Sequence, residues 1–409
     1  MKLSLPKDRI RVVLCESIHP IAEEIFREQG YSQVQRLPHA PGPEELQDLV
    51  RNSHILGIRS RTQIPQELLD LGNRLFCIGC FCIGTDQVDL AAAAKVGIPV
   101  FNAPHSNTRS VAELVLGFAI MLIRGIPDKT REAHQGRWQK TAKGSHELRG
   151  KTLGVVGYGH IGSQVSILAE ALGLRVLFYD IEPRLPLGNA RPTSSLQELL
   201  PQVDLLSLHV PDTPKTRGMI GPEELALMKP GSYLINTSRG MVVDHQALAT
   251  ALDQGRIGGA AIDVFPSEPK AKDEPFHSPL QHKRNVILTP HIGGSTEEAQ
   301  ENIAREVSHR LISFSDQGTS LGAVNFPQLG LGPHPGAHRL LHIHRNEPGV
   351  LRQINRCLGN HGLNILGQNL ETRRDLGYVV IDIAPAENGK EILQELRAIP
   401  GTLRARILF

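Results

Sequence analysis

A glycine-rich turn in the middle of the chain constrains the fold most. Residues 151–173 read KTLGVVGYGHIGSQVSILAEALG, which is an apolar strand pattern, a turn and then a helical pattern. Within it Gly157, Gly159 and Gly162 fit G-x-G-x-x-G. The first glycine allows a tight turn, the second lets the backbone approach a pyrophosphate, and the third lets helix and strand pack closely. The pattern therefore predicts a dinucleotide-binding unit that begins 150 residues into the chain.

Asp180 ends the next apolar run, 180 − 157 = 23 residues after Gly157. An acidic side chain at this point accepts hydrogen bonds from both ribose hydroxyls and repels a 2′-phosphate, which favours NAD over NADP. Arg184 lies nearby, and if it dominated, NADP would compete. The sequence predicts NAD as the cofactor.

Length and charge limit the class of protein. A chain of 409 residues is too long for one core and predicts several domains. With 21% charged residues and a net charge of 44 − 42 = +2, nothing indicates a nucleic-acid partner. The start, MKLSLPKDRIRVVLCE, has no apolar secretory segment, and the run 114–123 is shorter than the roughly 20 residues that cross a bilayer. We expect a cytoplasmic protein with no membrane partner.

Two α/β regions precede a smaller C-terminal region. The first hundred residues alternate short apolar runs with helical patterns, which predicts a parallel sheet, but they contain no phosphate loop. Six apolar runs between 151 and 294 predict a doubly wound sheet covered on both faces. The helical pattern 293–316 could return the chain to the first domain, so that the cofactor domain is inserted within it.

The predicted boundaries follow from these patterns. The substrate-binding domain covers 1–106 and is completed by 295–317, and the NAD-binding domain covers 107–294. Residues 318–337 are rich in Gly and Pro and predict a linker. Residues 338–409 spell β-α-β-β-α-β, which predicts a ferredoxin-like domain.

Three cysteines, Cys77, Cys80 and Cys82, stand within one apolar run. A structural metal site would need a second Cys or His pair at comparable spacing, and a redox CxxC normally sits at a helix start. We predict buried strand cysteines and no metal.

Polar residues follow the later strands of the cofactor region. Arg239, Asp263, Glu268 and His291 come after successive predicted strands, where an open α/β sheet binds its ligands. Each alone could be structural. Together they suit hydride transfer from an alcohol, with a histidine as base, a carboxylate to stabilise its imidazolium, and a planar guanidinium for a substrate carboxylate.

The set Arg239, Glu268 and His291, with GYGHIG and TPHIGGST, resembles the D-isomer-specific 2-hydroxyacid dehydrogenase family. That resemblance implies a Rossmann-like doubly wound parallel sheet inserted in a split flavodoxin-like α/β substrate domain. The stretches GIRSRT, IGCFCIGTDQVDL and VFNAPHSNTRSVAE, with the C-terminal module, resemble the bacterial members that carry an ACT domain. The resemblance implies NAD-dependent oxidation of 3-phosphoglycerate to 3-phosphohydroxypyruvate, the first step of L-serine synthesis, with a possible 2-oxoglutarate reductase side activity.

The resemblance also implies residue roles. Arg239 would clamp the substrate, Glu268 would partner the base, and His291 would accept the proton. The residues that would line NAD are Gly157, Gly159, His160, Ile161, Gly162, Asp180, Thr237, Ser238, Arg239, Asp263, His291, Gly293 and Gly294. The residues that would hold the substrate are Arg59, Ser60, Arg61 and Asn107, with Trp138 and Lys140 reaching the site of a neighbouring subunit.

The C-terminal module resembles an ACT domain, which implies an amino-acid effector. Two pairing surfaces, one through the nucleotide-binding domain and one at the ACT edge, lead us to expect a homotetramer. His344, Asn346 and Asn364 match the positions at which the family contacts L-serine, so we expect feedback inhibition by serine. Where relatives carry adjacent glycines as a hinge, this chain has Gly336–Ala337 preceded by two prolines. A stiffer hinge could blunt inhibition.

Two other functions stay open at this point. A glycerate or hydroxypyruvate reductase is the nearest enzymatic alternative, and it would not need both Arg59 and Arg61 or an amino-acid-sensing module. A non-catalytic NAD sensor is the alternative outside enzymes, but it would need a groove for a partner peptide.

Overall fold

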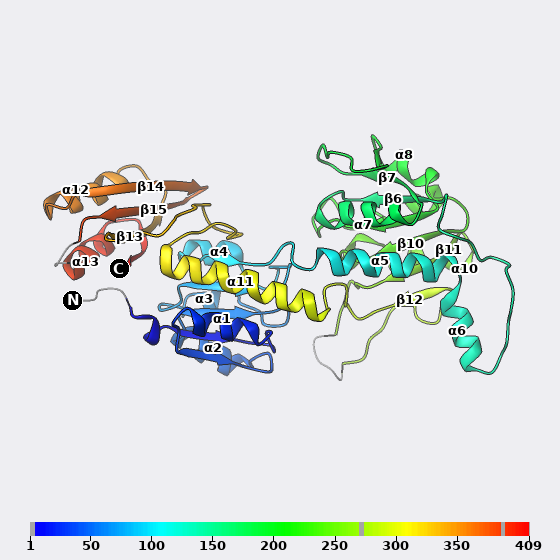
Figure 1. Ribbon diagram of the computed structural model, residues 1–409, viewed down its shortest axis with the longest axis horizontal. Helices are drawn as coiled ribbons and strands as arrows, with labels where there is room; N and C mark the ends of the chain where they lie inside the picture. The colour runs from blue at the N-terminus through cyan, green and yellow to red at the C-terminus, as the bar shows by residue number, and fades with distance from the viewer. Residues whose placement is uncertain (1–4, 270–273, 386–388, 409) are drawn as a thin grey trace. The chain divides into compact units, whose positions relative to one another are not determined.

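Two units make up the chain in the computed structural model, which describes residues 5–269, 274–385 and 389–408 (Figure 1). Unit one comprises Met1–Ser106 and Gln300–Phe409, and unit two is Asn107–Ala299. The ends of the predicted domains at residues 1–4 and 409 lie outside the described residues. The chain passes from unit two back to unit one after Ala299, inside helix α11. The sequence analysis places the end of the NAD-binding domain at 294.

Unit one begins with a five-stranded parallel sheet in the order β2-β1-β3-β4-β5, which is the flavodoxin-like order. The strands are β1 (Arg11–Leu14), β2 (Gln33–Arg36), β3 (Ile55–Ile58), β4 (Cys77–Cys80) and β5 (Val100–Phe101). The helices are α1 (Ile21–Glu28), α2 (Pro43–Asn52), α3 (Gln66–Leu69), α4 (Leu90–Lys95) and the returning α11 (Glu297–Gln317), with a 3-10 turn η1 (Lys7–Arg9). Cys77 and Cys80 are buried in β4 as predicted, but Cys82 lies after this strand and is half-buried, so the prediction is wrong for Cys82. The sequence analysis missed β2, because this edge strand is mostly exposed and carries no apolar pattern.

Helix α11 packs closely on the sheet of unit one. A methyl group at Gly79 in β4 would meet Leu311 and Val307 of α11 at 2.7 Å each. A side chain at this position would therefore push the helix away. The missing Cβ of one glycine sets the distance at which the returning chain completes the first domain.

Unit two contains a seven-stranded parallel sheet in the order β12-β11-β10-β9-β6-β7-β8, which is the doubly wound order with one further strand. Helices α5 and α7 cover one face, and α8, α9 and α10 cover the other (Figure 1). The strands are β6 (Thr152–Val156), β7 (Arg175–Tyr179), β8 (Arg191–Pro192), β9 (Leu205–Leu208), β10 (Ser232–Asn236), β11 (Ile257–Ile262) and β12 (Val286–Leu288). The helices are α5 (Thr108–Ile123), α6 (Ile126–His134), α7 (His160–Ala171), α8 (Leu196–Leu199), α9 (Pro222–Leu227) and α10 (His245–Asp253), with 3-10 turns η2 (Leu200–Gln202) and η3 (Gly240–Val242).

The C-terminal part of unit one is a four-stranded antiparallel sheet in the order β14-β15-β13-β16 with two helices on one face. Its elements are β13 (His338–Arg345), α12 (Val350–Asn360), β14 (Ile365–Arg373), β15 (Leu376–Ile383), α13 (Gly389–Ala398) and β16 (Thr402–Leu408). This is the ferredoxin-like arrangement that the sequence predicts. Its second face shares a hydrophobic core with β1, α1 and α11.

Arg404 on β16 ties this sheet to the first one. Its guanidinium donates to three backbone carbonyls, those of Val96 (2.6 Å), Leu75 (2.5 Å) and Gly72 (2.9 Å). The Val96 carbonyl lies at the C-terminal end of α4, where a helix leaves backbone acceptors unpaired. The C-terminal domain is therefore docked on the first domain by polar as well as apolar contacts.

The segment 318–337 contains no helix or strand, but its first part is not a free linker. Phe326 is fully buried, and Asn325 accepts a hydrogen bond from the Val100 amide (2.8 Å) and donates one to the Ile98 carbonyl (3.0 Å). The glycine and proline content suggests flexibility, whereas the few apolar residues between them anchor the segment in the core.

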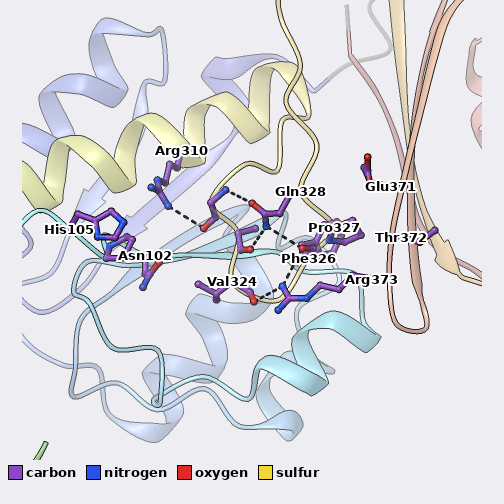
Figure 2. Close-up of a pocket in the computed structure, with 13 residues that line it drawn as sticks. Asn102, His105, Arg310, Val324, Phe326, Pro327, Gln328, Glu371, Thr372 and Arg373 are labelled. Carbon is purple, nitrogen blue, oxygen red and sulfur yellow. Dashed lines mark hydrogen bonds between the residues drawn. The ribbon is translucent and has the colours of Figure 1, made fainter. Parts of the chain in front are cut away.

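A cavity of about 720 Å³ lies where this segment meets β14. Figure 2 shows Arg373 donating to the carbonyls of Val324 (2.6 Å) and Phe326 (3.3 Å) at its wall. Arg310 on the same wall bonds to the Gly322 carbonyl and forms an ion pair with a glutamate of its own helix. Both guanidiniums are engaged by the protein, and none of the residues predicted for a site lines this cavity.

No single helix among the described residues is both long and apolar enough to cross a bilayer, although α5 and α6 pass the test as a pair bent by 69°.

Candidate active site

The three glycines of the central turn have three different surroundings. Gly157 has φ +89°, and a Cβ on it would lie 2.5 Å from the His209 carbonyl oxygen. A Cβ on Gly162 would lie 2.1 Å from the Gly157 carbonyl oxygen, whereas a Cβ on Gly159 would meet nothing within 4 Å. The first and third positions therefore require glycine for the turn and the packing. The second leaves open space at the N-terminus of α7, where backbone amides favour an anion.

Asp180 lies against this turn directly after β7. Its carboxylate accepts hydrogen bonds from the amides of Tyr158 (2.8 Å) and Glu182 (2.9 Å). The Arg184 Nε lies 3.4 Å from the same carboxylate. Arg184 therefore pairs with Asp180.

The loop after β10 carries Thr237, Ser238 and Arg239. It is shaped by Asn236, whose side chain is fully buried: the oxygen accepts from the amide (3.0 Å) and hydroxyl (2.8 Å) of Ser238, and the nitrogen donates to the Arg239 carbonyl (3.0 Å). The sequence analysis did not single out Asn236. The Thr237 hydroxyl is buried and has no hydrogen-bond partner, which fits a position that meets a bound cofactor.

The loops after β10 and β11 touch at Gly240. A Cβ on this glycine would lie 2.0 Å from the Phe265 carbonyl carbon, so no other residue fits without moving one of the loops. This contact brings Arg239 close to Glu268, and the positive charge of Arg239 lowers the pKa of both Glu268 and His291.

Asp263 follows β11 and is 1% exposed. One carboxylate oxygen accepts from the Thr289 hydroxyl (2.6 Å) and the Ile292 amide (2.8 Å), and the other accepts from the Gly293 amide (2.8 Å). Both oxygens are thus used to hold the loop after β12. Asp263 is predicted to line NAD, and these contacts show that it also positions the loop bearing His291.

His291 stands in this loop with φ 54°, in the left-handed region that a residue with a side chain rarely adopts. Its amide donates to the Asp263 carbonyl (2.9 Å). Its Nδ1 lies 2.9 and 3.1 Å from the two carboxylate oxygens of Glu268, which also accepts from the Phe265 amide (3.1 Å). Nδ1 therefore donates to Glu268, and Nε2 is the nitrogen left for a substrate.

The contact between His291 and Glu268 changes the pKa of both residues. The hydrogen bond to Glu268 raises the pKa of His291 above its ordinary value, although burial and Arg239 oppose it. Burial raises the pKa of Glu268, but the hydrogen bond and charge of His291, the Phe265 amide and Arg239 outweigh burial and lower it. Because Glu268 stabilises the imidazolium form of His291, the neutral imidazole can accept a proton from a bound alcohol.

Asn107 is the predicted substrate residue that lies in unit two. It occupies the N-cap position of α5, but its side chain makes no capping bond. Its amide nitrogen lies 2.2 Å from where a Cβ on Gly294 would stand, and its oxygen is buried without a partner. The other two residues of unit two, Trp138 and Lys140, are exposed, and Trp138 is 87% exposed.

The substrate residues of unit one, Arg59, Ser60 and Arg61, are on the loop after β3. The buried carboxylate of Glu16 accepts from the amides of Arg59, Arg61 and Thr62, each at 3.0 Å. Glu16 holds the backbone of this loop, and the side chains of Ser60 and Arg61 are exposed. Nothing in the sequence pattern distinguished Glu16 from a surface carboxylate.

The three predicted serine residues do not come together within one chain. His344 pairs across the sheet with Gly377 at the start of β15, and Asn346 donates to the carbonyls of the 374–375 turn beside it. Asn364 instead bonds to the Ala384 amide beyond the end of β15. Seven residues of strand separate these points, which is about 23 Å at roughly 3.3 Å per residue.

The family of the chain follows from comparison with known proteins. The model of the D-isomer specific 2-hydroxyacid dehydrogenase, NAD binding domain, matches residues 116–293, and that of an AHAS small subunit-like ACT domain matches residues 340–404. A solved structure, D-lactate dehydrogenase from Aquifex aeolicus complexed with NAD and lactic acid, is 31% identical with a TM-score of 0.66 and covers 74% of this chain and 95% of that one. The chain belongs to the D-isomer specific 2-hydroxyacid dehydrogenase family, and it is an NAD-dependent oxidoreductase.

Two relatives match the chain over its full length. The chain is 54% identical over 409 residues to the D-3-phosphoglycerate dehydrogenase of Escherichia coli K12, with 100% of both chains covered. It is 51% identical over 408 residues to the protein of the same name from Haemophilus influenzae, covering 100% of this chain and 99% of that one. The predicted family, fold class and cofactor are confirmed.

Replacing Asp263 tests its role in holding the loop. Asp263→Asn exchanges one acceptor oxygen for a donor that faces an N–H or O–H group, and we expect a loss of about 1–3 kcal/mol in the free energy of unfolding. Weaker NADH binding should accompany it. Chemical denaturation and NADH titration measure both. The matched control is Asp253→Asn, an exposed aspartate paired only with Lys283, which should stay within about 0.5 kcal/mol of the unchanged protein. Equal behaviour of the two variants would contradict the role.

Replacing Glu268 tests the coupling of the pair. In Glu268→Gln the carboxylate that most raises the pKa of His291 is gone, while burial and Arg239 still lower this pKa and the charge of Asp263 still raises it. The imidazole should therefore titrate at lower pH than in the unchanged protein. NMR of the histidine ring resonances measures this shift. Glu147→Gln, at an exposed glutamate, should leave the titration of His291 where it was. An unshifted His291 in Glu268→Gln would disprove the coupling.

Proposed function

We propose that this protein oxidises 3-phosphoglycerate to 3-phosphohydroxypyruvate with NAD, the reaction that opens L-serine synthesis. The observation that carries the proposal is 54% identity over the whole length to a D-3-phosphoglycerate dehydrogenase. The hydrogen-bonded His291–Glu268 pair, close to Arg239 at the carboxyl edge of the doubly wound sheet, supports it.

The residues of unit two divide the chemistry among them. The guanidinium of Arg239 would bind the substrate carboxylate in a bidentate manner and hold the adjacent hydroxyl at His291. The hydroxyl proton would pass to Nε2 of His291, since Nδ1 is occupied by Glu268. Glu268 would stabilise the resulting imidazolium. NAD would supply the acceptor for the hydride from the carbon that bears this hydroxyl, so that this carbon becomes the carbonyl carbon of the product.

The cofactor residues fit a dinucleotide. The open space at Gly159 and the amides of His160 and Ile161 would take the pyrophosphate, and Asp180 would take the ribose hydroxyls. The unpartnered Thr237 hydroxyl, with Ser238, Gly293 and Gly294, would complete the pocket. Asp263 would act by positioning Gly293 rather than by contact.

The phosphate of the substrate would be bound by Arg59, Ser60 and Arg61. Two guanidiniums suit a dianion, and Glu16 fixes the backbone from which they extend. A glycerate or hydroxypyruvate reductase would gain nothing from this pair, which disfavours that alternative. A non-catalytic NAD sensor would not need the His291–Glu268 pair. A side activity toward 2-oxoglutarate and a cytoplasmic location remain part of the proposal.

Kinetics of three proteins test the reaction. The unchanged protein should form NADH with 3-phosphoglycerate and far less with glycerate. His291→Ala should lose about 10²–10⁴-fold in kcat while it still binds NADH, because the ring acts on the proton. Arg239→Lys should be severely impaired, since lysine cannot reproduce the planar fork. Energy transfer from Trp138, the only tryptophan, reports NADH binding in each variant.

Several outcomes would contradict the proposal. Equal rates with glycerate would favour the reductase. Undiminished turnover in His291→Ala would exclude it as the base. NADH binding without turnover of any 2-hydroxy acid by the unchanged protein would favour a sensor.

We also propose that L-serine binds between two ACT domains of a homotetramer and inhibits the enzyme. The separation of Asn364 from His344 and Asn346 within one chain supports a pocket completed by a second copy. Polar amides and an imidazole offer both donors and acceptors to the zwitterion.

The rate of NADH formation at increasing concentrations of L-serine tests this inhibition. L-serine should lower the rate of the unchanged protein, and Asn346→Ala should raise the serine concentration for half-inhibition at least about tenfold by removing a donor and an acceptor. Asn369→Ala, on the exposed face of β14, is the control and should behave like the unchanged protein. A rate independent of serine at saturation would exclude feedback inhibition.

A further inference from the structure

Three different metal-ligating side chains meet on the helical face of the ACT domain. Cys357 on α12, His361 directly after α12 and Glu395 on α13 offer one ligand atom each, and these atoms all lie within 4.8 Å of one another. Within the described residues, no other group of three histidine, cysteine, aspartate or glutamate side chains meets this condition. The cluster belongs to neither the dehydrogenase residues nor the predicted serine residues.

The fold explains why the three side chains converge. Cys357 and His361 are four residues apart, so they lie one turn apart on the same side of α12. Helices α12 and α13 pack on one face of the ACT sheet through a shared core that includes Ile354 and Leu396. That core fixes the distance between the helices and places Glu395 opposite the other two residues.

The distances suit a tetrahedral ion. His361 Nε2 lies 3.0 Å from one oxygen of Glu395, and Cys357 Sγ lies 3.4 Å from the other. Ligand atoms at 2.0–2.3 Å from a tetrahedral zinc ion are roughly 3.3–3.8 Å apart. Since the three ligand atoms lie within 4.8 Å of one another, side-chain shifts of about 1 Å would bring them to that spacing around an ion.

We propose that Cys357, His361 and Glu395 form a zinc site with three protein ligands and a fourth position open to solvent. Thiolate, imidazole and carboxylate together are ligands of zinc and related transition metals, whereas magnesium and calcium take oxygen ligands only. Glu395 is exposed, which gives an ion and a water ligand access to the cluster.

Binding would be linked to the thiol proton. Coordination replaces that proton with the ion, so one proton is released and affinity falls as the pH falls. The ion would join the end of α12 to α13 and stabilise the ACT domain.

The sequence analysis predicted no metal. A cysteine and a histidine four residues apart are a weak signal, and the third ligand follows 395 − 361 = 34 residues later. Only the packing of the two helices joins them. The inference concerns a site separate from the proposed dehydrogenase reaction and does not depend on it.

Cobalt titration tests the site without an activity assay. Chelator-treated full-length protein is titrated with Co²⁺, and a thiolate-to-cobalt charge-transfer band in the near ultraviolet should grow to one ion per chain and disappear on addition of Zn²⁺. Cys357→Ser should abolish the band, because no thiolate remains at the site. His361→Gln and Glu395→Gln should each weaken binding by roughly 10- to 100-fold.

The controls separate this site from other cysteines and histidines. Cys82→Ser removes the half-buried cysteine of the substrate-binding domain and should leave the band unchanged. Thermal unfolding with Zn²⁺ should shift upward in the unchanged protein and in Cys82→Ser, but not in Cys357→Ser. Absence of the band in the unchanged protein, or its persistence in Cys357→Ser, would overturn the proposal.

Discussion

The carboxylate of Asp263 is the constraint on which the geometry of unit two depends. It is buried at the end of β11 and its oxygens accept from Thr289, Ile292 and Gly293, while its backbone carbonyl accepts from His291. A buried charge is tolerated only when such partners satisfy it. The loop therefore cannot leave Asp263 without exposing that charge to an apolar interior, and this holds His291 in a conformation it would otherwise avoid.

Unit one uses the same device. Glu16 is buried after β1, has φ 60°, and accepts three amides from the loop that carries Arg59 and Arg61. Each of the two units thus has a buried carboxylate that fixes a loop at the carboxyl end of its parallel sheet. The ionisable side chains of that loop are left to face outward. Rigid backbone with outward polar groups is the arrangement that binding and catalysis need.

The sequence predicted what periodicity and spacing encode. The apolar runs predicted the buried strands, and the glycine spacing predicted the turn after β6. It did not reveal Asn236 or Glu16, because a buried polar residue that bonds to a distant loop leaves no mark in the local pattern. The sequence analysis singled out Asp263 for the cofactor but not for holding the loop after β12, since position at a strand end does not say which way a carboxylate faces. The packing of Phe326 was hidden by the glycine and proline residues around it.

The docking of the ACT domain changes what its hinge can do. Residues of β13 and β15 share a core with α11, and Arg404 bonds to three carbonyls of the substrate-binding domain. Movement about Gly336–Ala337 alone would have to separate that core and leave the guanidinium of Arg404 without its acceptors. Because burying an unpaired guanidinium is costly, the sheet face is a stiffer connection than the hinge. The contacts of α11 and β16 therefore join the ACT sheet to the first domain independently of the residues that stand at the hinge.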